Sequence, residues 1–300
     1  MRRFLASLLF LCGIAAQDPG AAFKTIYLQR RAEPNERAFT ILVPRKWAVQ
    51  GGIFRIDPSR AGGPANAIGA KLDFTVKRDE AGTVLFRALP EMLYFDARRS
   101  PAGQMGLFPP GSNYNGMTVY PLMTALDFLK RPAFPQAHRQ ARAVEILEQR
   151  SLPQTAQKYL QRVRSFPIRM TFSYDAAVLT ATYEEGGVRY KERMFAVVED
   201  WGQLGAGMWG DKETLCFRAP AAEFEQWARV IALIQNSVKP NQQWIAGELR
   251  GQIERDSDQW RYRWVTPSGD VAVSNDQNYD PNHDLLINRS DFKRTPVRPR

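Results

Sequence analysis

Two long apolar segments joined by a glycine pair constrain the fold of this chain more than any other feature of its sequence. Residues 170–183 and 188–198 are rich in Val, Thr and aromatic side chains, and Glu184-Glu185-Gly186-Gly187 stands between them. Runs of this kind on either side of a short glycine-containing turn are typical of an antiparallel hairpin. The sequence therefore predicts that the chain is built on antiparallel β-structure.

A later segment has the period of a helix instead. Phe224, Trp227, Ile231 and Ile234 are spaced three, four and three residues apart, and Pro220 precedes them. This spacing places the four side chains on one face of a helix. We predict that this face packs against the sheet and belongs to the core, not to a ligand site.

The remaining patterns extend the same architecture. Period-2 alternation at Leu72, Phe74 and Val76 predicts a half-buried strand, and short strands are also expected over 208–209 and 214–217. A helix is expected over 121–130, opened by Pro121 and ended by Pro132 and Pro135. We infer an α+β protein in which antiparallel β-sheets pack against helices, as two related modules or one enlarged module. The expected parts are a signal peptide over 1–16, a β-rich module with a long loop and a helix over 23–135, a second α+β module over 141–240, and a C-terminal helix with an extended tail over 241–300.

The N-terminus predicts export. Arg2 and Arg3 precede the apolar residues 4–12, and Ala16 offers a small residue for cleavage before a polar stretch. The apolar run is shorter than the roughly 20 residues that span a bilayer, so we predict a removable signal and no transmembrane segment in the mature chain. The expected location is periplasmic or secreted.

Composition narrows the class of protein further. Cleavage would leave Cys216 alone, which excludes an intramolecular disulfide and a cysteine zinc site, so stability must come from a packed core. The formal net charge is +10, but the basic residues are scattered. We therefore expect no nucleic-acid partner, and attraction to an envelope protein or to an anionic envelope polymer or lipid instead.

Two stretches resemble a known family. Residues 39–47, which read Phe-Thr-Ile-Leu-Val-Pro-Arg-Lys-Trp, are similar to the opening strand of PsbP-like exported proteins. Residues 217–239 resemble the closing helix of that fold, which ends in a Ser-Val-Lys phrase. The resemblance implies PsbP-like modules, an antiparallel sheet covered by helices, and an exported location. It implies no catalytic residues.

A search for reactive side chains predicts no catalytic residue and no cofactor. The chain has two histidines, His138 and His283, and Cys216 lies within an apolar strand where it serves as a small hydrophobe. The alternative is a hydrolase that uses acids near Glu199 and Asp200, which precede a glycine-rich run.

The tail has a spacing that resembles a calcium loop, with acids and amides at Asp276, Asn278, Asp280, Asn282 and Asp284. Pro281 stands where such a loop needs glycine, and Ile287 stands where it needs a bidentate Glu. Clusters of Asn, Asp and Pro also form turns without any ion. We predict no metal site.

Aromatic residues are the best candidates for binding. Phe108, Tyr114 and Tyr120 lie on the Gly- and Pro-rich segment 100–120, and Trp201 and Trp209 flank a glycine-rich run. We predict a non-enzymatic envelope protein that uses them to bind a partner protein or an anionic or amphiphilic component. A structural or assembly factor without a small-molecule site is the other alternative.

Overall fold

The computed structural model describes residues 25–164, 172–202, 205–248, 262–267, 271–274, 277–283 and 290–295. Contacts divide the chain into two units, one that runs to Asn241 and one that begins at Gln242. The predicted signal peptide lies outside the described residues. Within the part that the structure describes, no helix has the length and apolar character needed to cross a membrane.

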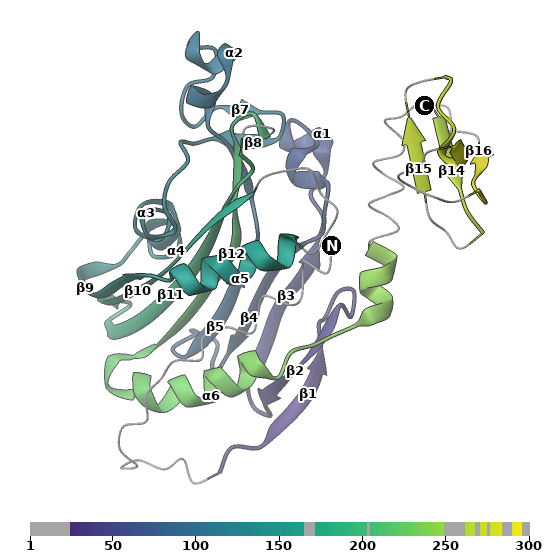
Figure 1. Cartoon of the computed structure of the whole chain (residues 1–300). Helices are drawn as coiled ribbons and strands as arrows, with labels where there is room; N and C mark the ends of the chain where they lie inside the picture. Colours follow the sequence, from purple (N-terminus) through teal and green to yellow (C-terminus); the bar gives the residue numbers. More distant parts are fainter. Residues whose placement is uncertain are drawn as a thin grey trace. The chain divides into compact units, whose positions relative to one another are not determined.

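A ten-stranded sheet forms the centre of the first unit (Figure 1). Its strands are β3 (Ala48–Phe54), β4 (Lys71–Lys77), β5 (Leu85–Leu89), β6 (Leu93–Phe95), β7 (Asn113–Tyr114), β8 (Met117–Val119), β9 (Arg142–Ser151), β10 (Ser173–Glu185), β11 (Val188–Asp200) and β12 (Met208–Pro220). Seven of them follow the order β3-β4-β5-β12-β11-β10-β9, β6 joins β12, and β7 and β8 continue from β6. The pairs are antiparallel except β6 with β8.

The predicted hairpin is confirmed in this sheet, next to edge strand β9. Strands β10 and β11 pair from Ser173 with Asp200 to Glu185 with Val188. Gly186 and Gly187 connect them with φ angles of 58° and 79°, which glycine adopts at little cost. Strands of both predicted modules pair in this one sheet, so the α+β class is confirmed and a single enlarged unit describes it.

Strand β12 corrects the expectation of two short strands over 208–217. It runs without interruption for 13 residues, through Asp211, Lys212 and Glu213. Its register with β11 shifts here, so that Val197 faces Glu213 and Val198 faces Asp211. Lys212 is therefore the extra residue of a β-bulge. Asp211, Lys212 and Glu213, which looked like a strand break, lie inside the strand because each side chain has a partner from a distant part of the chain.

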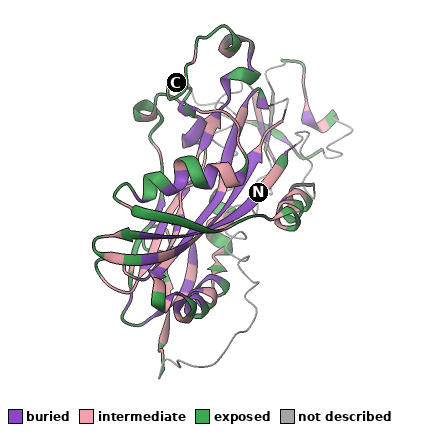
Figure 2. Cartoon of the chain, turned by 90° about the vertical axis from the view of Figure 1, so that its left-hand side faces the viewer, coloured by how far each residue is buried: buried purple, intermediate pink, exposed green. Residues whose placement is uncertain are grey.

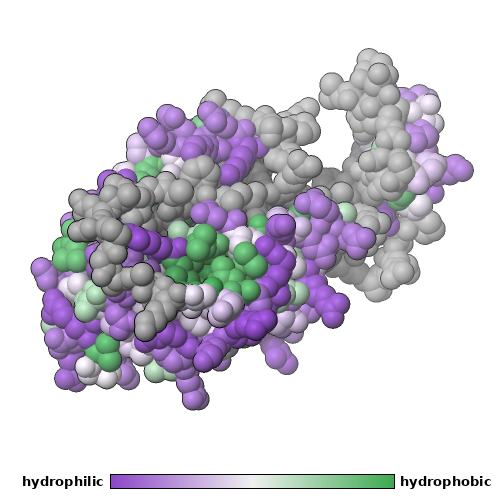
Figure 3. Space-filling view, turned by 90° about the horizontal axis from the view of Figure 1, so that it is seen from below, coloured by the Kyte–Doolittle hydropathy of each residue, from purple (hydrophilic) through white to green (hydrophobic). Residues whose placement is uncertain are grey.

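One face of the sheet is covered by α5 (Pro153–Arg164), α6 (Phe224–Asn236) and a small sheet of β1 (Leu28–Ala32), β2 (Phe39–Pro44) and β13 (Lys239–Pro240). The Phe224 ring of α6 stacks on Phe217 of β12 with centroids 4.5 Å apart, and Phe39 of β2 meets Phe74 of β4 at 5.2 Å. The predicted helix is confirmed, with Phe224, Trp227, Ile231 and Ile234 all buried. Viewed from below, the surface is largely hydrophilic, with a hydrophobic area near the centre and smaller ones toward the left (Figure 3).

The opposite face packs against α3 (Ala125–Phe128), the π-helical turn η4 (Leu129–Ala133) and α4 (Phe134–Ala137). The expected helix over 121–130 is wrong at both ends, because the chain becomes helical only after Thr124 and continues past Pro132 and Pro135. A wider π turn accommodates Pro132, which has no N–H to donate within a helix. Edge strand β9, at the left in Figure 1, faces the viewer in Figure 2 and is exposed along most of its length.

Short helical turns complete the first unit: α1 (Pro58–Ala61), η2 (Ala65–Ala67), η3 (Ala97–Arg99), α2 (Pro101–Gln104) and η6 (Ala221–Glu223). The segment 100–120, expected to be a long loop, therefore contains α2, β7 and β8. Their hydrogen bonds to one another and to neighbouring strands give it a defined path.

The second unit begins with helical residues 242–248 and contains a small sheet in the order β15-β14-β16. The strands are β14 (Tyr262–Val265), β15 (Val271–Ser274) and β16 (Lys293–Thr295), and η7 (Pro281–His283) precedes the last of them. Asn282 hydrogen-bonds both backbone groups of Phe292, and Asp280 Oδ1 accepts from Asn282 N. These two calcium-loop candidates thus shape turns, while Asp276 and Asp284 lie outside the described residues.

Candidate functional site

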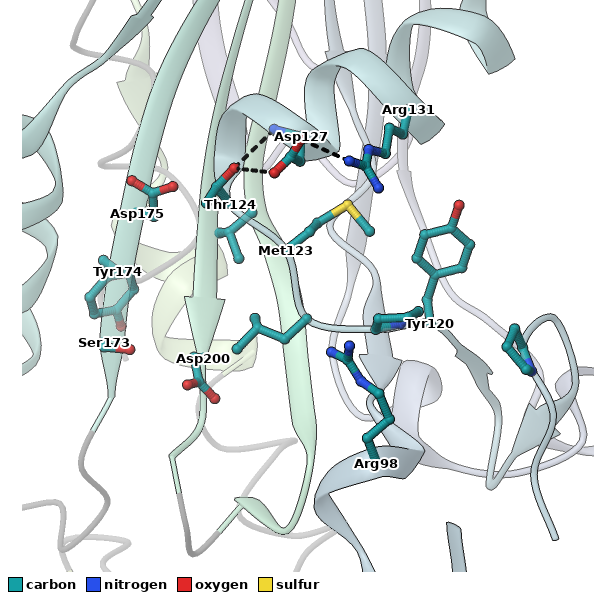
Figure 4. A pocket seen from close by; sticks show the side chains of 14 residues that line it. Arg98, Tyr120, Met123, Thr124, Asp127, Arg131, Ser173, Tyr174, Asp175 and Asp200 are labelled. Carbon is teal, nitrogen blue, oxygen red and sulfur yellow. Dashed lines mark hydrogen bonds and ion pairs between the residues drawn. The ribbon is translucent and has the colours of Figure 1, made fainter. Parts of the chain in front are cut away.

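A cavity of about 780 Å³ opens between the start of α3 and the ends of β10 and β11 (Figure 4). Apolar and aromatic side chains form much of its lining, and charged groups stand around them. The lining residues are Arg98, Pro110, Tyr120, Pro121, Leu122, Met123, Thr124, Asp127, Arg131, Ser173, Tyr174, Asp175, Val198 and Asp200. Its size is that of a typical ligand pocket.

The wall that carries Tyr120 and Leu122 is fixed by hydrogen bonds to the sheet. Trp209 Nε1 donates to the Tyr120 carbonyl at 2.8 Å, and the Leu122 N–H donates to Asp96 Oδ2 at 3.0 Å. The Tyr120 N–H donates to the Phe95 carbonyl at 2.9 Å. Because both sides of this extended segment are bonded, the wall is formed before any ligand arrives.

The start of α3 is held just as firmly. Thr124 is its N-cap: the Asp127 N–H donates to Thr124 Oγ1 at 3.1 Å, and that hydroxyl donates to Asp127 Oδ2 at 2.9 Å. Asp175 on β10 accepts from the Ala125 N–H at 2.7 Å, which ties the helix to the sheet. A carboxylate at a helix N-terminus is also favoured by the helix dipole.

Two arginines and two aspartates lie on opposite sides of the cavity in Figure 4, and a third aspartate, Asp127, stands beside Arg131. Arg98 and Arg131 stand on the side of Tyr120, and Asp175 and Asp200 stand on the side of the strand ends. Both arginines are largely exposed, with 66% and 72% of their side-chain surface accessible. Their guanidinium groups can therefore reach a bound molecule.

Each of these arginines is oriented by an acid. Arg98 donates to both oxygens of buried Asp96, at 2.9 and 2.6 Å, and Arg131 lies 3.5 Å from Asp127. Burial acts to raise the pKa of Asp96, but the hydrogen bonds from Arg98 and Leu122 outweigh it and lower that pKa below its ordinary value. Asp96 is therefore ionised at neutral pH, and the bidentate pair holds Arg98 at the rim.

Three of the five aromatic residues predicted to bind a partner meet, but beside the cavity rather than within it. Phe108, Tyr114 and Trp201 pack against the cluster that contains Phe95, whose ring stacks on Tyr114 with centroids 3.9 Å apart. Trp209 belongs to a different cluster and is fully buried, so it offers no surface to a ligand and supports the wall through its indole N–H. Tyr120, from the same predicted segment, is the residue that lines the cavity.

The acids of the hydrolase alternative do not converge. Glu199 and Asp200 are consecutive on β11, so their side chains point to opposite faces of the sheet. Glu199 is buried and accepts from the Tyr174 hydroxyl, whereas Asp200 lines the cavity and pairs with Arg99 at 2.7 Å. One of the two carboxylates is thus within reach of a ligand.

A buried polar network lies elsewhere on the same sheet, around His138. Its Nε2 is 2.8 Å from Glu192 and its Nδ1 is 3.3 Å from Glu185, which also pairs with Arg218 at 2.9 Å. Burial works to lower the pKa of His138, but the two carboxylates outweigh it and raise that pKa. The Tyr183 hydroxyl donates to Glu192 at 2.5 Å. This network joins the residue after α4 to three strands.

The thiol of Cys216 has no access to a ligand. Cys216 is buried, as predicted from its strand, and burial raises the pKa of its thiol. Among the described residues, no three His, Cys, Asp or Glu side chains are grouped so that they could hold a metal ion.

Sequence reasoning missed Arg98, Arg131 and Asp175 as site residues. They come from segments far apart in the chain, and each is an ordinary surface residue when its own neighbours alone are considered. The threonine–aspartate spacing at 124 and 127 was the available local signal, because it marks a helix start.

Comparison with known proteins adds one likeness. Neither a family model nor a curated protein matches the sequence. A similar solved structure is that of cyanobacterial PsbP from Synechocystis sp. PCC 6803, with a TM-score of 0.31 and 11% identity over 75% of this chain and 98% of that one. The matched protein is a PsbP, and residues 39–47 and 217–239 of this chain resemble PsbP-like proteins. At this TM-score it carries no argument, so the function must be inferred from the residues of this chain.

Proposed function

We propose that this chain is an exported, non-enzymatic binding protein whose cavity takes an extended segment of a partner protein that carries both charge signs. The observation behind the proposal is the opposed arrangement of Arg98 and Arg131 against Asp175 and Asp200, over an apolar lining. A peptide can place an acid and a base on either side of an apolar residue, and electrostatic complementarity then fixes its direction.

The balance of charge supports a mixed ligand over a polyanion. The lining holds two arginines and three aspartates, so the cavity lacks the positive excess that the whole chain has. A strongly acidic polymer would meet Asp127, Asp175 and Asp200 as well as the arginines. Like charges at close range oppose binding, which favours a segment of alternating sign.

Binding without chemistry is supported by the engagement of the carboxylates. Asp127, Asp175 and Asp200 each accept a hydrogen bond or ion pair from a fixed protein donor, namely Thr124, Ala125 and Arg99. A general base must be within hydrogen-bond reach of its substrate's proton. We therefore assign these three carboxylates to the positioning of α3 and Arg99, and not to proton transfer.

Three synthetic peptides test the proposal. They share one length and one central leucine and tyrosine, and their flanking residues are acidic, basic or alternating. Fluorescence anisotropy should give the tightest binding for the alternating peptide, and Arg131→Glu should weaken that binding by about tenfold. Arg142→Glu, on exposed strand β9 outside the cavity lining, is the matched control and should leave it unchanged. Tightest binding of the acidic peptide, or equal binding by Arg131→Glu, would reject the proposed ligand.

The exported location is tested separately. A reporter fused after residues 1–22 should cross the inner membrane, and the mature chain should begin near Gln17. Recovery of the uncleaved chain in the cytoplasm would remove the compartment from the proposal and leave the cavity argument intact.

A further inference from the structure

The small sheet of β1, β2 and β13 has a free edge along β1 (Figure 1). The Tyr27 carbonyl and the Glu33 N–H, at the two ends of this strand, bond across the hairpin at 2.9 Å each. In an antiparallel pair every second residue bonds to the partner strand. The backbone groups of the alternate residues Leu28, Arg30 and Ala32 therefore point to the free edge, where no described residue bonds them.

The fold gathers positive charge around this edge, although basic residues are scattered along the sequence. Six cations belong to the small sheet and its turns, five of them exposed and one half-buried. They are Arg30 and Arg31 of β1, Arg37 in the turn before β2, Arg45 and Lys46 directly after β2, and Lys239 of β13. We name these six residues the basic edge.

None of these cations is neutralised by an acid in the part of the chain that the structure describes. Arg30 donates to Thr40 Oγ1 at 3.1 Å and to the Ser237 carbonyl at 3.0 Å, and Arg31 donates to the Arg45 carbonyl at 3.3 Å. These acceptors carry no formal charge. The guanidinium groups are therefore oriented while their charge stays available to a partner.

The acids of the same region are engaged elsewhere. Glu33 and Glu36 are the two acids between residues 25 and 46. Glu33 is buried and its two oxygens accept hydrogen bonds from four backbone N–H groups. Glu36 pairs with Arg55 at 3.0 Å. The basic edge therefore keeps its positive excess.

The two arginines of β1 flank the free edge on both faces of the small sheet. Arg31 lies opposite buried Ile41, and Arg30 lies opposite Leu42, which is half-buried. Successive residues of a strand point to opposite faces. A strand that paired with β1 would thus meet one arginine above the sheet and one below it.

We propose that β1 binds an extended acidic segment of a partner protein as an added strand. The main chain of the segment bonds the free backbone groups of Leu28, Arg30 and Ala32, and its carboxylates meet Arg30 on one face and Arg31 on the other. In strand addition, main-chain hydrogen bonds supply affinity and the alternate side chains supply specificity. This surface is separate from the cavity, because no residue of the basic edge lines it.

The charge and the free edge together favour this occupant over two others. A second copy of the chain would set the arginines of one β1 against those of the other, and charged edges oppose such self-pairing. An anionic lipid surface would attract the cations but has no row of donors and acceptors that matches a strand. An acidic strand satisfies both features at once.

Two dye-labelled peptides test the role of charge by fluorescence anisotropy. One alternates glutamate with valine and threonine, and the other has glutamine at each glutamate position. The probe protein is the chain from Gln17, the mature form predicted by the sequence, with the full chain in parallel. We expect the acidic peptide to bind about tenfold more tightly than the glutamine peptide, and the Arg30→Glu, Arg31→Glu double variant to lose about tenfold. Arg139→Glu with Arg142→Glu removes the same formal charge from exposed residues elsewhere and should bind as the parent does.

Amide hydrogen exchange measured by NMR tests whether a strand is added. Saturating acidic peptide should slow the exchange of the Leu28, Arg30 and Ala32 amides by about tenfold or more, because they gain hydrogen bonds. The amides of Gln29 and Arg31, which face β2, should change little.

Equal binding of the two peptides, unslowed exchange of the three outward amides, or full binding by the double variant would overturn the proposal. Dimerisation through β1 in sedimentation velocity, or binding to phosphatidylglycerol vesicles in preference to the acidic peptide, would also overturn it. A circular dichroism spectrum unchanged from the parent is required of each variant, and the exchange measurement on the parent needs no variant. Arg131→Glu, in the cavity, should leave this binding unchanged, so that this proposal and the proposed function fail separately.

Discussion

Replacing Glu213 with glutamine tests how the ten-stranded sheet tolerates a buried carboxyl group. The side chain lies on β12, is 7% exposed, and accepts from the Tyr159 hydroxyl of α5, while its Oε1 has no hydrogen-bond partner. Burial raises the pKa of Glu213 to about 8, against the opposing effects of Tyr159 and Arg162. At neutral pH the folded protein therefore holds a proton there, and glutamine resembles this neutral form.

The size of the effect follows from linkage. The unfolded chain loses this proton near the ordinary pKa of 4.5, and the folded chain keeps it up to about 8. Between those values the unfolded state binds fewer protons, so the free energy of unfolding falls as the pH rises, by about 1.4 kcal/mol for each unit. The parent then loses about 3 kcal/mol between pH 4.5 and pH 7 through Glu213. Glutamine removes this loss, but its amide leaves a donor to satisfy, at a cost of about 1 to 3 kcal/mol.

Urea denaturation at several pH values between 5 and 8 measures the difference between Glu213→Gln and the parent. We expect the variant to gain stability relative to the parent as the pH rises, by about 2 to 4 kcal/mol over the range. Asp211, whose pKa burial also raises to about 8, contributes equally to both proteins and cancels. Leu233→Ala, at an exposed leucine of α6, changes no titratable group and should show a difference that is constant with pH. A constant difference for Glu213→Gln as well would mean that Glu213 is ionised in the folded protein.

Three further substitutions probe other parts of the fold. Trp227→Ala should lower the free energy of unfolding by about 3 to 5 kcal/mol, because it empties a site packed against Trp47. Leu233→Ala, at an exposed leucine, should lower it by less than about 1 kcal/mol. An equally small effect for Trp227→Ala would place the tryptophan outside the core. His138→Gln should flatten the pH dependence of the urea midpoint. Because its pKa is raised in the folded protein, His138 stabilises the fold below pH 6.5 and loses that contribution as the pH rises through the folded-state pKa. An unchanged pH profile would exclude the ion pairs of His138 with its carboxylates. Glu33→Gln should lower the free energy of unfolding, measured by thermal denaturation, by about 2 to 4 kcal/mol, because the two oxygens of this buried carboxylate accept hydrogen bonds from four backbone N–H groups. A change within experimental error would show that water replaces these hydrogen bonds.

The β10–β11 hairpin and the helix over 224–236 could be predicted because their signals are local. Gly186 and Gly187 supply the φ angles of the turn, and the spacing of Phe224, Trp227, Ile231 and Ile234 is a property of one helix face. These elements keep the same preference in any fold that buries their apolar side.

The path of β12 could not be predicted, because its stability depends on distant partners. Asp211 accepts from the Met92 N–H at 2.7 Å, and Lys212 pairs with Glu91. In the sequence these residues are separated by more than a hundred positions, so the charged stretch resembles a break between two strands. A buried polar or charged group is stable only when it is hydrogen-bonded or paired, and its partners are decided by the tertiary structure.

By itself, the sequence determined the α+β class, the antiparallel hairpin and the helix face that covers the sheet, since each follows from periodicity or from backbone preference over a few residues. Only the tertiary structure decided that both predicted modules share one sheet, that Trp209 supports a wall instead of binding a ligand, and that Arg98, Asp175 and Asp200 surround one cavity. The physical reason is that a site depends on which side chains from remote segments meet. Strand register, the sheet face on which each residue lies and long-range hydrogen bonds fix that meeting, and a local pattern specifies none of them.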